Sequence, residues 1–247
     1  MPDESPDTRR LEEQRDDVRL LNQVMRHDIR NDLQLIGAYA ELLEDHVDEE
    51  GQEYLDVIKE STESAVGLTT TVRDLAEVML NDGGETGSVP LAGALNRRIE
   101  ETRSGYPRAV VAVEGTIPEV DVVANDMLGS VFRNLLQNAI QHNDKTPAEV
   151  TVWAAETDAG VEVYVADNGP GIPDARKEEI FGKAEKGLES PGAGVGLYLV
   201  RSLVESYGGA VWVEDRADRT VPGASQGDDG DDGAEGSVFV VRLPPAE

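Results

Sequence analysis

The chain has 247 residues, with 50 acidic side chains against 22 basic ones, so its formal net charge at pH 7 is −28. This charge excludes a surface that binds nucleic acid or anionic membranes, because such surfaces need Lys and Arg to neutralise phosphates. The absence of cysteine excludes disulfides and Cys-ligated metal sites and favours a reducing compartment. The N-terminal segment is polar and no stretch is apolar enough to span a bilayer, so we expect a cytoplasmic protein without direct membrane insertion.

Lysine is scarce, with five Lys against 17 Arg, and three of the five lie between residues 177 and 186. Acidic enrichment combined with few lysines resembles the proteins of haloarchaea and other organisms that keep molar salt in the cytoplasm. Salt at 1 M shortens the Debye length to about 3 Å, which makes such a surface tolerable. We therefore expect a halophilic protein, with an ordinary acidic protein as the alternative.

The first third of the chain is predicted to be a helical hairpin. After a tail or linker at 1–15, apolar residues recur every three or four positions through 18–43 and again through 55–79. The acidic, glycine-containing segment 46–52 indicates a turn between the two helices. A two-helix hairpin leaves an apolar face that a second copy can cover, so residues 16–81 are predicted to form a four-helix bundle in a homodimer.

After a Gly-rich linker at 82–89, the pattern predicts an α+β two-layer sandwich at 90–247 with antiparallel strands. Helices are predicted at 90–104, at 125–142 with Asn125 as N-cap, within 168–196, and from there to about 207. Strands are predicted at 109–114, 119–124, 149–156, 161–167, 209–216 and 237–243. The acidic segment 221–236 is interpreted as a solvated loop.

The segment HDIRNDL, at 27–33, places a histidine on the exposed side of the first predicted helix. His27 lies about 200° around the helix from the nearest apolar positions, and Asn31 lies one turn further on the same face. Asp28 can hold one ring nitrogen of His27 and leave the other as a nucleophile, while the Asn31 carboxamide can orient a water or a phosphoryl oxygen. A solvated surface histidine is the alternative for this motif alone.

The segment NLLQNAIQHND, at 134–144, places the carboxamides of Asn134, Asn138 and Gln141 on one helix face. Asparagine is a poor helix former, so a pair of them in one helix favours a functional reason. A carboxamide oxygen can coordinate Mg²⁺ bound to phosphates, and the NH₂ group can donate to a phosphate oxygen. The alternative is a helix with an exposed polar face.

The segment DNGPGIP, at 167–173, follows a predicted strand. Gly169 and Gly171 permit a tight turn, and Asp167 at the strand end can accept from the exocyclic amino group of adenine. A plain turn is the alternative.

The segment GAGVGLYLV, at 192–200, opens a helix with Gly192, Gly194 and Gly196. Its glycine spacing is not that of a dinucleotide-binding fingerprint, and the chain has neither a P-loop nor the motif set of Ser/Thr kinases. The free N–H groups and the positive end of the helix dipole at the helix start can nevertheless bind phosphates. Lys183 and Lys186, which precede the loop, add positive charge beside it.

These four motifs, together with IFGKAEKG at 180–187, resemble in order those of the histidine protein kinases of two-component systems, over residues 16–245. The resemblance implies His27 as phosphoacceptor, Asp28 as its activating acid and Asn31 as a residue for dephosphorylating the partner. It implies ATP and Mg²⁺ as cofactors, with Asn138 as metal ligand and Asp167 as adenine reader. The further nucleotide contacts that it implies are Asn134, Gln141, Gly169, Gly171, Lys183, Lys186, Gly192, Gly194, Gly196 and Leu197.

The implied function is a homodimeric, ATP-dependent protein-histidine kinase that passes the phosphoryl group to an Asp in the receiver domain of a response regulator, with phosphatase activity toward that regulator. Two alternatives stay open, a non-kinase ATPase clamp of the same superfamily and an inactive pseudokinase scaffold. The chain departs from the family at Asp32, where Pro is frequent, and in having Phe181 as the only aromatic residue of its segment. We expect the signal to come from a sensory input domain or partner outside this chain.

Overall fold

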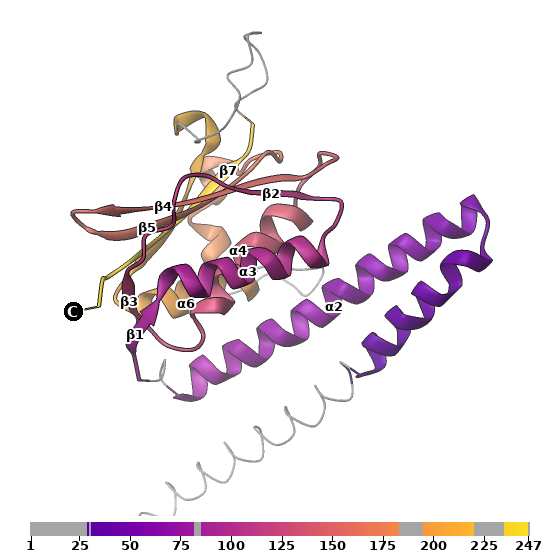
Figure 1. Ribbon diagram of the computed structural model, residues 1–247, viewed down its shortest axis with the longest axis horizontal. Helices are drawn as coiled ribbons and strands as arrows, with labels where there is room; N and C mark the ends of the chain where they lie inside the picture. Colours follow the sequence, from indigo (N-terminus) through magenta and orange to yellow (C-terminus); the bar gives the residue numbers. More distant parts are fainter. Residues whose placement is uncertain (1–28, 30, 82–84, 183–194, 220–234, 247) are drawn as a thin grey trace, which may run out of the picture. The chain divides into compact units, whose positions relative to one another are not determined.

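The computed structural model describes residues 29, 31–81, 85–182, 195–219 and 235–246. The chain divides after Leu80 into two compact units, a helical hairpin and a helix-on-sheet sandwich (Figure 1). Within the described residues, no helix combines the length and the apolar character needed to cross a bilayer.

The first unit is the predicted hairpin. Residues 31–43 are helical and are followed by the short turn η1 (Glu44–His46) and by α2 (Glu49–Asn81). The second helix begins inside the segment expected as the turn, because the carboxylate of Asp48 accepts the N–H of Gly51 at 3.0 Å and so satisfies one free donor of the first turn. The part of the first predicted helix before residue 29 lies outside the described residues.

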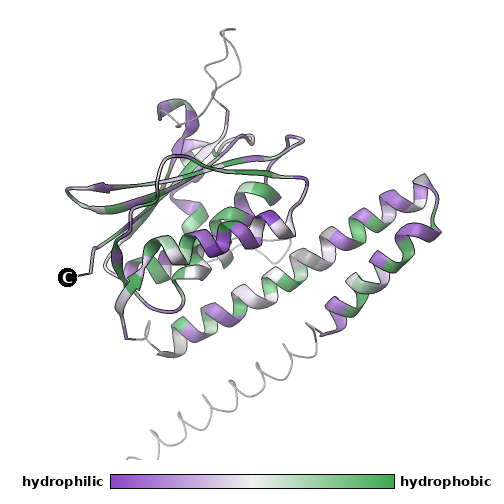
Figure 2. Cartoon of the chain, viewed as in Figure 1, coloured by the Kyte–Doolittle hydropathy of each residue, from purple (hydrophilic) through white to green (hydrophobic). Residues whose placement is uncertain are grey.

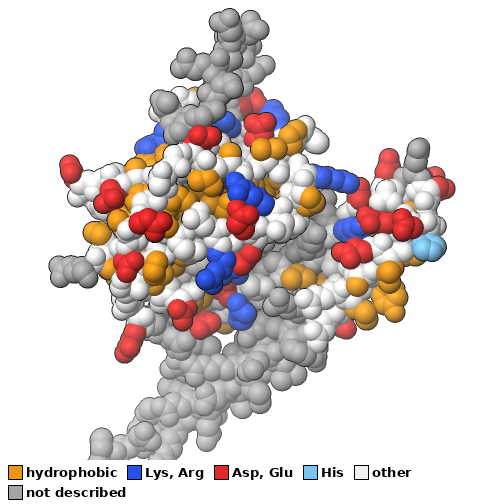
Figure 3. Space-filling view, viewed as in Figure 1, with side chains coloured by type: hydrophobic (Ala, Val, Ile, Leu, Met, Phe, Trp, Pro, Cys, Tyr) orange, Lys and Arg blue, Asp and Glu red, His pale blue; other side chains and the backbone are white. Residues whose placement is uncertain are grey.

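The hairpin buries few of its apolar side chains. Ala40 and Leu55 are buried between the two helices, at 3% and 4% exposure. An open apolar groove of about 300 Å³ lies beside them, lined by Leu35, Ile36, Tyr39, Ala40, Leu43, Leu55 and Ile58. Figure 3 shows apolar side chains, in orange, at the surface of this unit. The groove contains Ile36, Ala40, Leu43, Leu55 and Ile58 of the predicted apolar stripes, together with Leu35 and Tyr39, which lie outside them.

The second unit packs helices against one face of a mixed sheet (Figure 1). The strands, in spatial order, are β2 (Val110–Val113), β4 (Glu149–Thr157), β5 (Gly160–Asp167), β7 (Ser237–Leu243) and β6 (Ala210–Asp215). The helices are α3 (Leu91–Gly105), α4 (Leu128–Gln141) and α6 (Val195–Ser206). The expectation of antiparallel strands is wrong at one edge, where β2 and β4 run parallel because the chain between them crosses over through α4.

A small separate sheet pairs β1 (Gly87–Pro90) with β3 (Asp121–Ala124). Residues 87–89 of β1 belong to the segment expected as a linker, and Pro90, expected to start a helix, ends this strand instead. Proline is tolerated there because it stands at a strand end, where it need not donate to a ladder. The following helix begins directly after it, at Leu91.

Asn125 is not the N-cap of α4, since that helix begins at Leu128 after Met127. Its Oδ1 accepts the N–H of Met127 at 3.0 Å and the hydroxyl of Tyr207 at 2.6 Å. Burial raises the pKa of Tyr207 well above its usual value, so this hydroxyl remains a donor. Asn125 therefore closes the turn before α4 and ties it to the residue that follows α6.

The core of the sandwich lies between the helices and the facing side of the sheet (Figure 2). Alternate residues of β5, Val163 and Val165, point into it because side chains alternate along a strand. They are fully buried together with Phe132 and Leu135 of α4 and Leu203 of α6. This packed layer fixes the end of β5 and the inner side of α4, where motif residues lie.

The remaining short elements are α5 (Asp174–Lys177), η2 (Glu179–Phe181) and η3 (Arg216–Asp218). Phe181 is buried and meets Phe239 of β7 edge-on, with ring centroids 6.2 Å apart. Lys177 is held by the carboxylates of Asp174 and Asp215, each at 2.6 Å.

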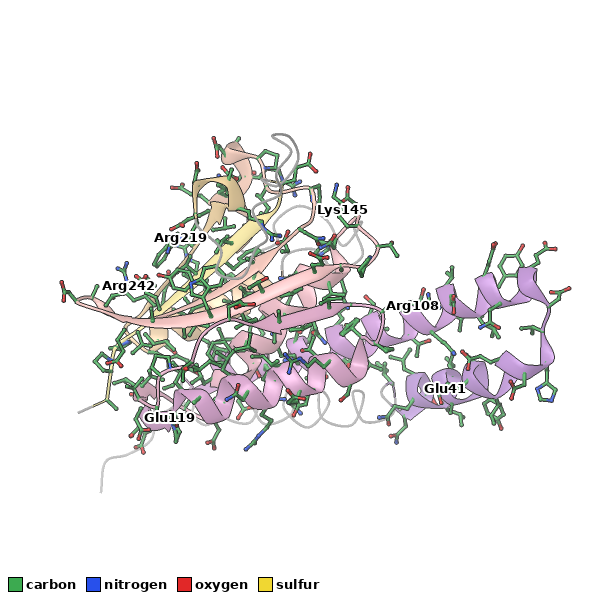
Figure 4. All side chains as sticks on the ribbon, turned by 45° about the horizontal axis from the view of Figure 1, so that its top comes forward. Glu41, Arg108, Glu119, Lys145, Arg219 and Arg242 are labelled. Carbon is green, nitrogen blue, oxygen red and sulfur yellow. The ribbon has the colours of Figure 1, made fainter. Side chains whose placement is uncertain are left out.

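The outer face of the sheet, opposite the helices, is covered by its own side chains. Six of them form a closed circuit of contacts around Val240, here called the outer-face ring: Arg242, Trp212, Glu214, Arg219, Tyr164 and Glu162. Arg219 and Arg242 are labelled in Figure 4. Each lies over an aromatic ring, 4.6 and 4.8 Å from its centroid, and each pairs with one of the glutamates. Val240 has 0% exposure, so among the described residues the side chains of the sheet itself close this apolar outer face.

Candidate active site

The carboxamides of α4 differ in their surroundings. Asn134 is buried, at 5% exposure, and its Nδ2 donates to the carbonyl oxygen of Ser130 at 2.7 Å. Asn138 is half-buried. Gln141 is exposed and its Nε2 donates to the hydroxyl of Tyr106, just after α3, at 3.0 Å. Asn138 and Gln141 are therefore the carboxamides of this face that a ligand in solvent can reach.

The first turn of α6 lies against α4. A Cβ placed on Gly196 would lie 2.7 Å from Oδ1 of Asn134, so only glycine allows this approach. Gly196 and Leu197 are half-buried in that turn, where backbone N–H groups are free of intrahelical partners. The structure thus brings the second and fourth motifs into contact. The positions predicted for phosphate contact before α6, Lys183, Lys186, Gly192 and Gly194, lie outside the described residues.

Asp167 ends β5 as a buried side chain with 7% exposure. Its Oδ1 accepts the N–H of Gly169 at 2.9 Å and the N–H of Ser237 at 3.2 Å. In the described part of the chain, its Oδ2 accepts no hydrogen bond. Burial raises the pKa of Asp167 above its usual value, while the two N–H groups and the charge of Arg216 act in the opposite direction. The carboxylate is fixed through one oxygen and can accept from a ligand through the other.

The turn after Asp167 is fastened to the end of α4. Gly171 has a φ of +73°, which favours glycine. The side chain of Asn143, just after α4, donates to Oδ1 of Asn168 at 2.8 Å, and the same oxygen accepts the N–H of Glu149 at 2.9 Å. Sequence reasoning did not single out Asn143, Asn168 or Ser237 as site residues. The available signal was that the first two lie within the segments NLLQNAIQHND and DNGPGIP.

The residues predicted for phosphoryl chemistry belong to the other unit. Asn31 is helical and exposed, and His27 and Asp28 lie outside the described residues. The motif predicted to carry the phosphoacceptor and the motifs predicted to bind nucleotide therefore belong to different units of the chain.

Comparison with protein families matches both units. Residues 124–247 match the model for histidine kinase-, DNA gyrase B- and HSP90-like ATPases, and residues 17–79 match the His Kinase A phospho-acceptor domain. The chain belongs to the histidine kinase-, DNA gyrase B- and HSP90-like ATPase family. The two domains in this order, with histidine kinases among the relatives, support a two-component sensor histidine kinase.

Curated relatives match only part of their own length. The sensor-type histidine kinase PrrB of Mycobacterium leprae (strain TN) is 27% identical over 197 residues, covering 77% of this chain and 43% of that protein. The histidine-protein kinase/phosphatase MprB of Mycobacterium sp. (strain KMS) is 31% identical over 183 residues, covering 72% of this chain and 33% of that protein. This chain therefore spans less than half the length of either relative.

Solved structures confirm the fold. A mycobacterial sensor histidine kinase MprB, 24% identical, covers 65% of this chain and 99% of that structure with a TM-score of 0.53. Full-length ShkA in complex with AMPPNP, 23% identical, covers 92% of this chain and 46% of that structure with a TM-score of 0.55. The expected architecture of a helical module followed by an α/β sandwich is confirmed.

Proposed function

We propose that this chain is the catalytic core of an ATP-dependent protein-histidine kinase, which phosphorylates His27 and then an Asp in the receiver domain of a response regulator. The observation that carries the proposal is the buried Asp167 carboxylate, which is fixed through Oδ1 and whose Oδ2 accepts no hydrogen bond from the described residues. The phospho-acceptor match, which spans His27 and Asn31, supports the assignment of a kinase rather than a clamp ATPase.

ATP binds, in this proposal, to the sandwich. Oδ2 of Asp167 accepts the 6-amino group of adenine, and the N–H groups at Gly196 and Leu197 face the phosphates. Lys183, Lys186, Gly192 and Gly194 supply further phosphate contacts, with Gly169 and Gly171 shaping the turn on the adenine side. The AMPPNP bound in the ShkA structure supports a nucleotide in this fold.

Magnesium fits the donor chemistry of α4. The described residues contain no group of three or more His, Cys, Asp or Glu side chains that could hold a metal, so an ion here would take most ligands from phosphates and water, as Mg²⁺ commonly does. The half-buried carboxamide of Asn138 offers one neutral oxygen of the required kind. A bound Mg²⁺ would neutralise phosphate charge.

The phosphoacceptor acts by nucleophilic attack. Asp28 holds one ring nitrogen of His27 and leaves the other nitrogen free to attack the γ-phosphorus, while the bond from phosphorus to the bridging oxygen breaks and ADP leaves. Asn134 and Gln141 provide polar side chains on the same face of α4 as Asn138, the face that is proposed to contact the phosphates. Positioning and charge neutralisation supply most of the rate enhancement.

The exposed apolar groove of the hairpin supports a homodimer, since a second copy would cover it. A sensory region or partner outside this chain would supply the signal. The need for cytosolic ATP favours the cytoplasm, and the net charge of −28 with few lysines favours a protein adapted to high salt.

Incubation with γ-labelled ATP and Mg²⁺ in molar KCl tests the kinase. We expect label that is lost in acid and stable in alkali, as for a phosphohistidine. The variant His27→Gln should take up no label yet bind ADP as the wild type does, because the two sites lie in different units. Label on His27→Gln at the wild-type level would refute the phosphoacceptor. ATP hydrolysis without label would indicate the clamp ATPase, and neither activity would indicate the scaffold.

Dephosphorylation of the regulator is a second function, supported by the kinase/phosphatase name of one relative. Asn31 is exposed. Its spacing of four residues from His27 predicts that it lies one helical turn away, where its carboxamide can orient a water beside an aspartyl phosphate. Asn31→Ala should leave autophosphorylation intact and slow regulator dephosphorylation by a factor of about 10². The exposed neighbour Asp32→Asn is the control. Equal decay of phospho-regulator with the Asn31→Ala variant and the wild type would contradict this role.

A further inference from the structure

The backbone at Asp167 is held by a side chain from outside its own strand pair. The pairing of β5 with β7 ends at Ala166 and Val238, so the next carbonyl lies beyond the ladder. That carbonyl, on Asp167, accepts from Nη1 of Arg216 at 2.8 Å. Arg216 begins η3 directly after β6, and its guanidinium supplies a donor where the neighbouring strand no longer does.

Arg216 is itself fixed by the residue before β7. Its backbone N–H donates to the carbonyl oxygen of Gly236 at 3.1 Å. Gly236 has a φ of +127°, and a Cβ there would lie 2.1 Å from the carbonyl oxygen of Asp167 and 3.2 Å from Cδ of Arg216. A glycine is therefore required for the Arg216 side chain and the Asp167 carbonyl to meet at this point.

The same small region holds the carboxylate. Ser237, which follows Gly236, donates its N–H to Oδ1 of Asp167 at 3.2 Å. Arg216 fixes the main chain of Asp167, and Ser237 fixes its side chain, so both determine where the second carboxylate oxygen, Oδ2, lies. The positive charge of Arg216 also favours the ionised carboxylate, the form that accepts a hydrogen bond from an amino group.

We propose that Arg216 is a positioning residue for base selectivity: by binding the Asp167 carbonyl it holds the carboxylate at the angle that accepts the 6-amino group of adenine. This inference rests on the adenine-reading role proposed for Asp167 and adds the residue that enforces it. A purely structural Arg216 would affect the binding of all nucleotides equally, whereas a positioning Arg216 affects only nucleotides that carry the 6-amino group.

The test compares ADP with purine riboside diphosphate, which lacks only that amino group, by calorimetric titration. Wild type should prefer ADP by at least about tenfold, the value of a hydrogen bond to a charged acceptor. Arg216→Ala should reduce the preference to about threefold or less through weaker ADP binding, with the affinity for purine riboside diphosphate unchanged. Arg216→Lys, which keeps a charge and a donor, should restore part of the preference.

Arg219→Ala is the matched control, because Arg219 lies on the same segment but binds Glu214 and the Tyr164 ring. It should keep the wild-type preference. A wild type without preference would overturn the adenine-reading role of Asp167. A wild-type preference that survives in Arg216→Ala, or equal loss for both nucleotides, would overturn the role of Arg216 alone. If Arg216→Ala does not fold, the same titrations are made with Arg216→Gln. A preference for ADP equal to that of the wild type in Arg216→Gln would overturn the proposal.

Discussion

The sandwich buries most of its large apolar side chains, whereas the hairpin leaves many of its own exposed to water. Phe132 and Leu135 in α4 have 0% exposure, while Tyr39 and Leu42 in the hairpin expose 61% and 68%. The difference follows from geometry, since a sheet covered by helices closes around a core and two helices alone cannot. The sandwich thus closes its core within one chain, whereas the hairpin presents an apolar face that the proposed homodimer would cover.

Truncating one large side chain in each unit is the strongest test of this difference in burial. Phe132→Ala should cost about 3–5 kcal/mol of sandwich stability, because it leaves a cavity in a packed core. Tyr39→Ala should cost the sandwich nothing and weaken only association of the hairpin. Calorimetric unfolding of each variant measures both effects. A sandwich transition that shifts equally in the two variants would show that the units are not independent.

A charge placed in the groove of the hairpin tests the dimer next. Leu35, at 56% exposure, lines that groove, and Leu35→Glu should weaken dimerisation by about 2 kcal/mol, close to the value of one buried leucine. ADP affinity should not change. Gln34→Glu adds the same charge at the adjacent exposed position and is the control. Sedimentation equilibrium that finds the same dimer constant for both variants would show that the groove is not the interface.

Salt should affect stability through the net charge of −28. When KCl falls from 1 M to below about 0.1 M, the Debye length exceeds about 10 Å and carboxylates repel one another. We expect the melting temperature to fall by about 4 °C or more over this range, corresponding to about 1 kcal/mol. A melting temperature independent of KCl would contradict adaptation to high salt and leave the kinase unaffected.

The smallest expected effect is the pH response of Asp167. Because burial raises its pKa above the usual 3.8, the folded nucleotide-free protein binds this proton more tightly than the unfolded chain does. Its contribution to stability is present below pH 3.8 and is lost as pH rises through the raised pKa, while ADP affinity rises over the same window. The difference in melting temperature between wild type and Asp167→Asn, followed against pH, measures this, and a flat difference would contradict it.

Sequence periodicity located elements whose partners are close in the chain. The hairpin of β4 and β5 alternates clearly around a short turn, and apolar residues recur at helical spacing through most of α2. The strand β1 was missed because four residues ending in Pro90 show no alternation that distinguishes a strand from the start of a helix. The parallel pairing of β2 with β4 depends on packing across the crossover, which local patterns do not encode.

The candidate site shows the same limit. Asp167 stood out because a carboxylate at a strand end before glycines is a local signal. Its contact with Arg216 spans 49 residues, and that between Asn143 and Asn168 spans 25. No motif spacing records such contacts, because they arise only when β6, β7 and α4 pack around the end of β5.

The outer-face ring also determines which structural change the intrinsic tryptophan fluorescence of this protein reports. Both tryptophans of the chain, Trp153 and Trp212, lie on the outer face of the sheet, the second beneath a guanidinium. The hairpin has no tryptophan, and its aromatic residues are Tyr39 and Tyr54. Tryptophan emission will therefore follow the unfolding of the sandwich and will not report association of the hairpin. An unfolding experiment followed by tryptophan fluorescence can thus monitor the sandwich alone, without an added dye.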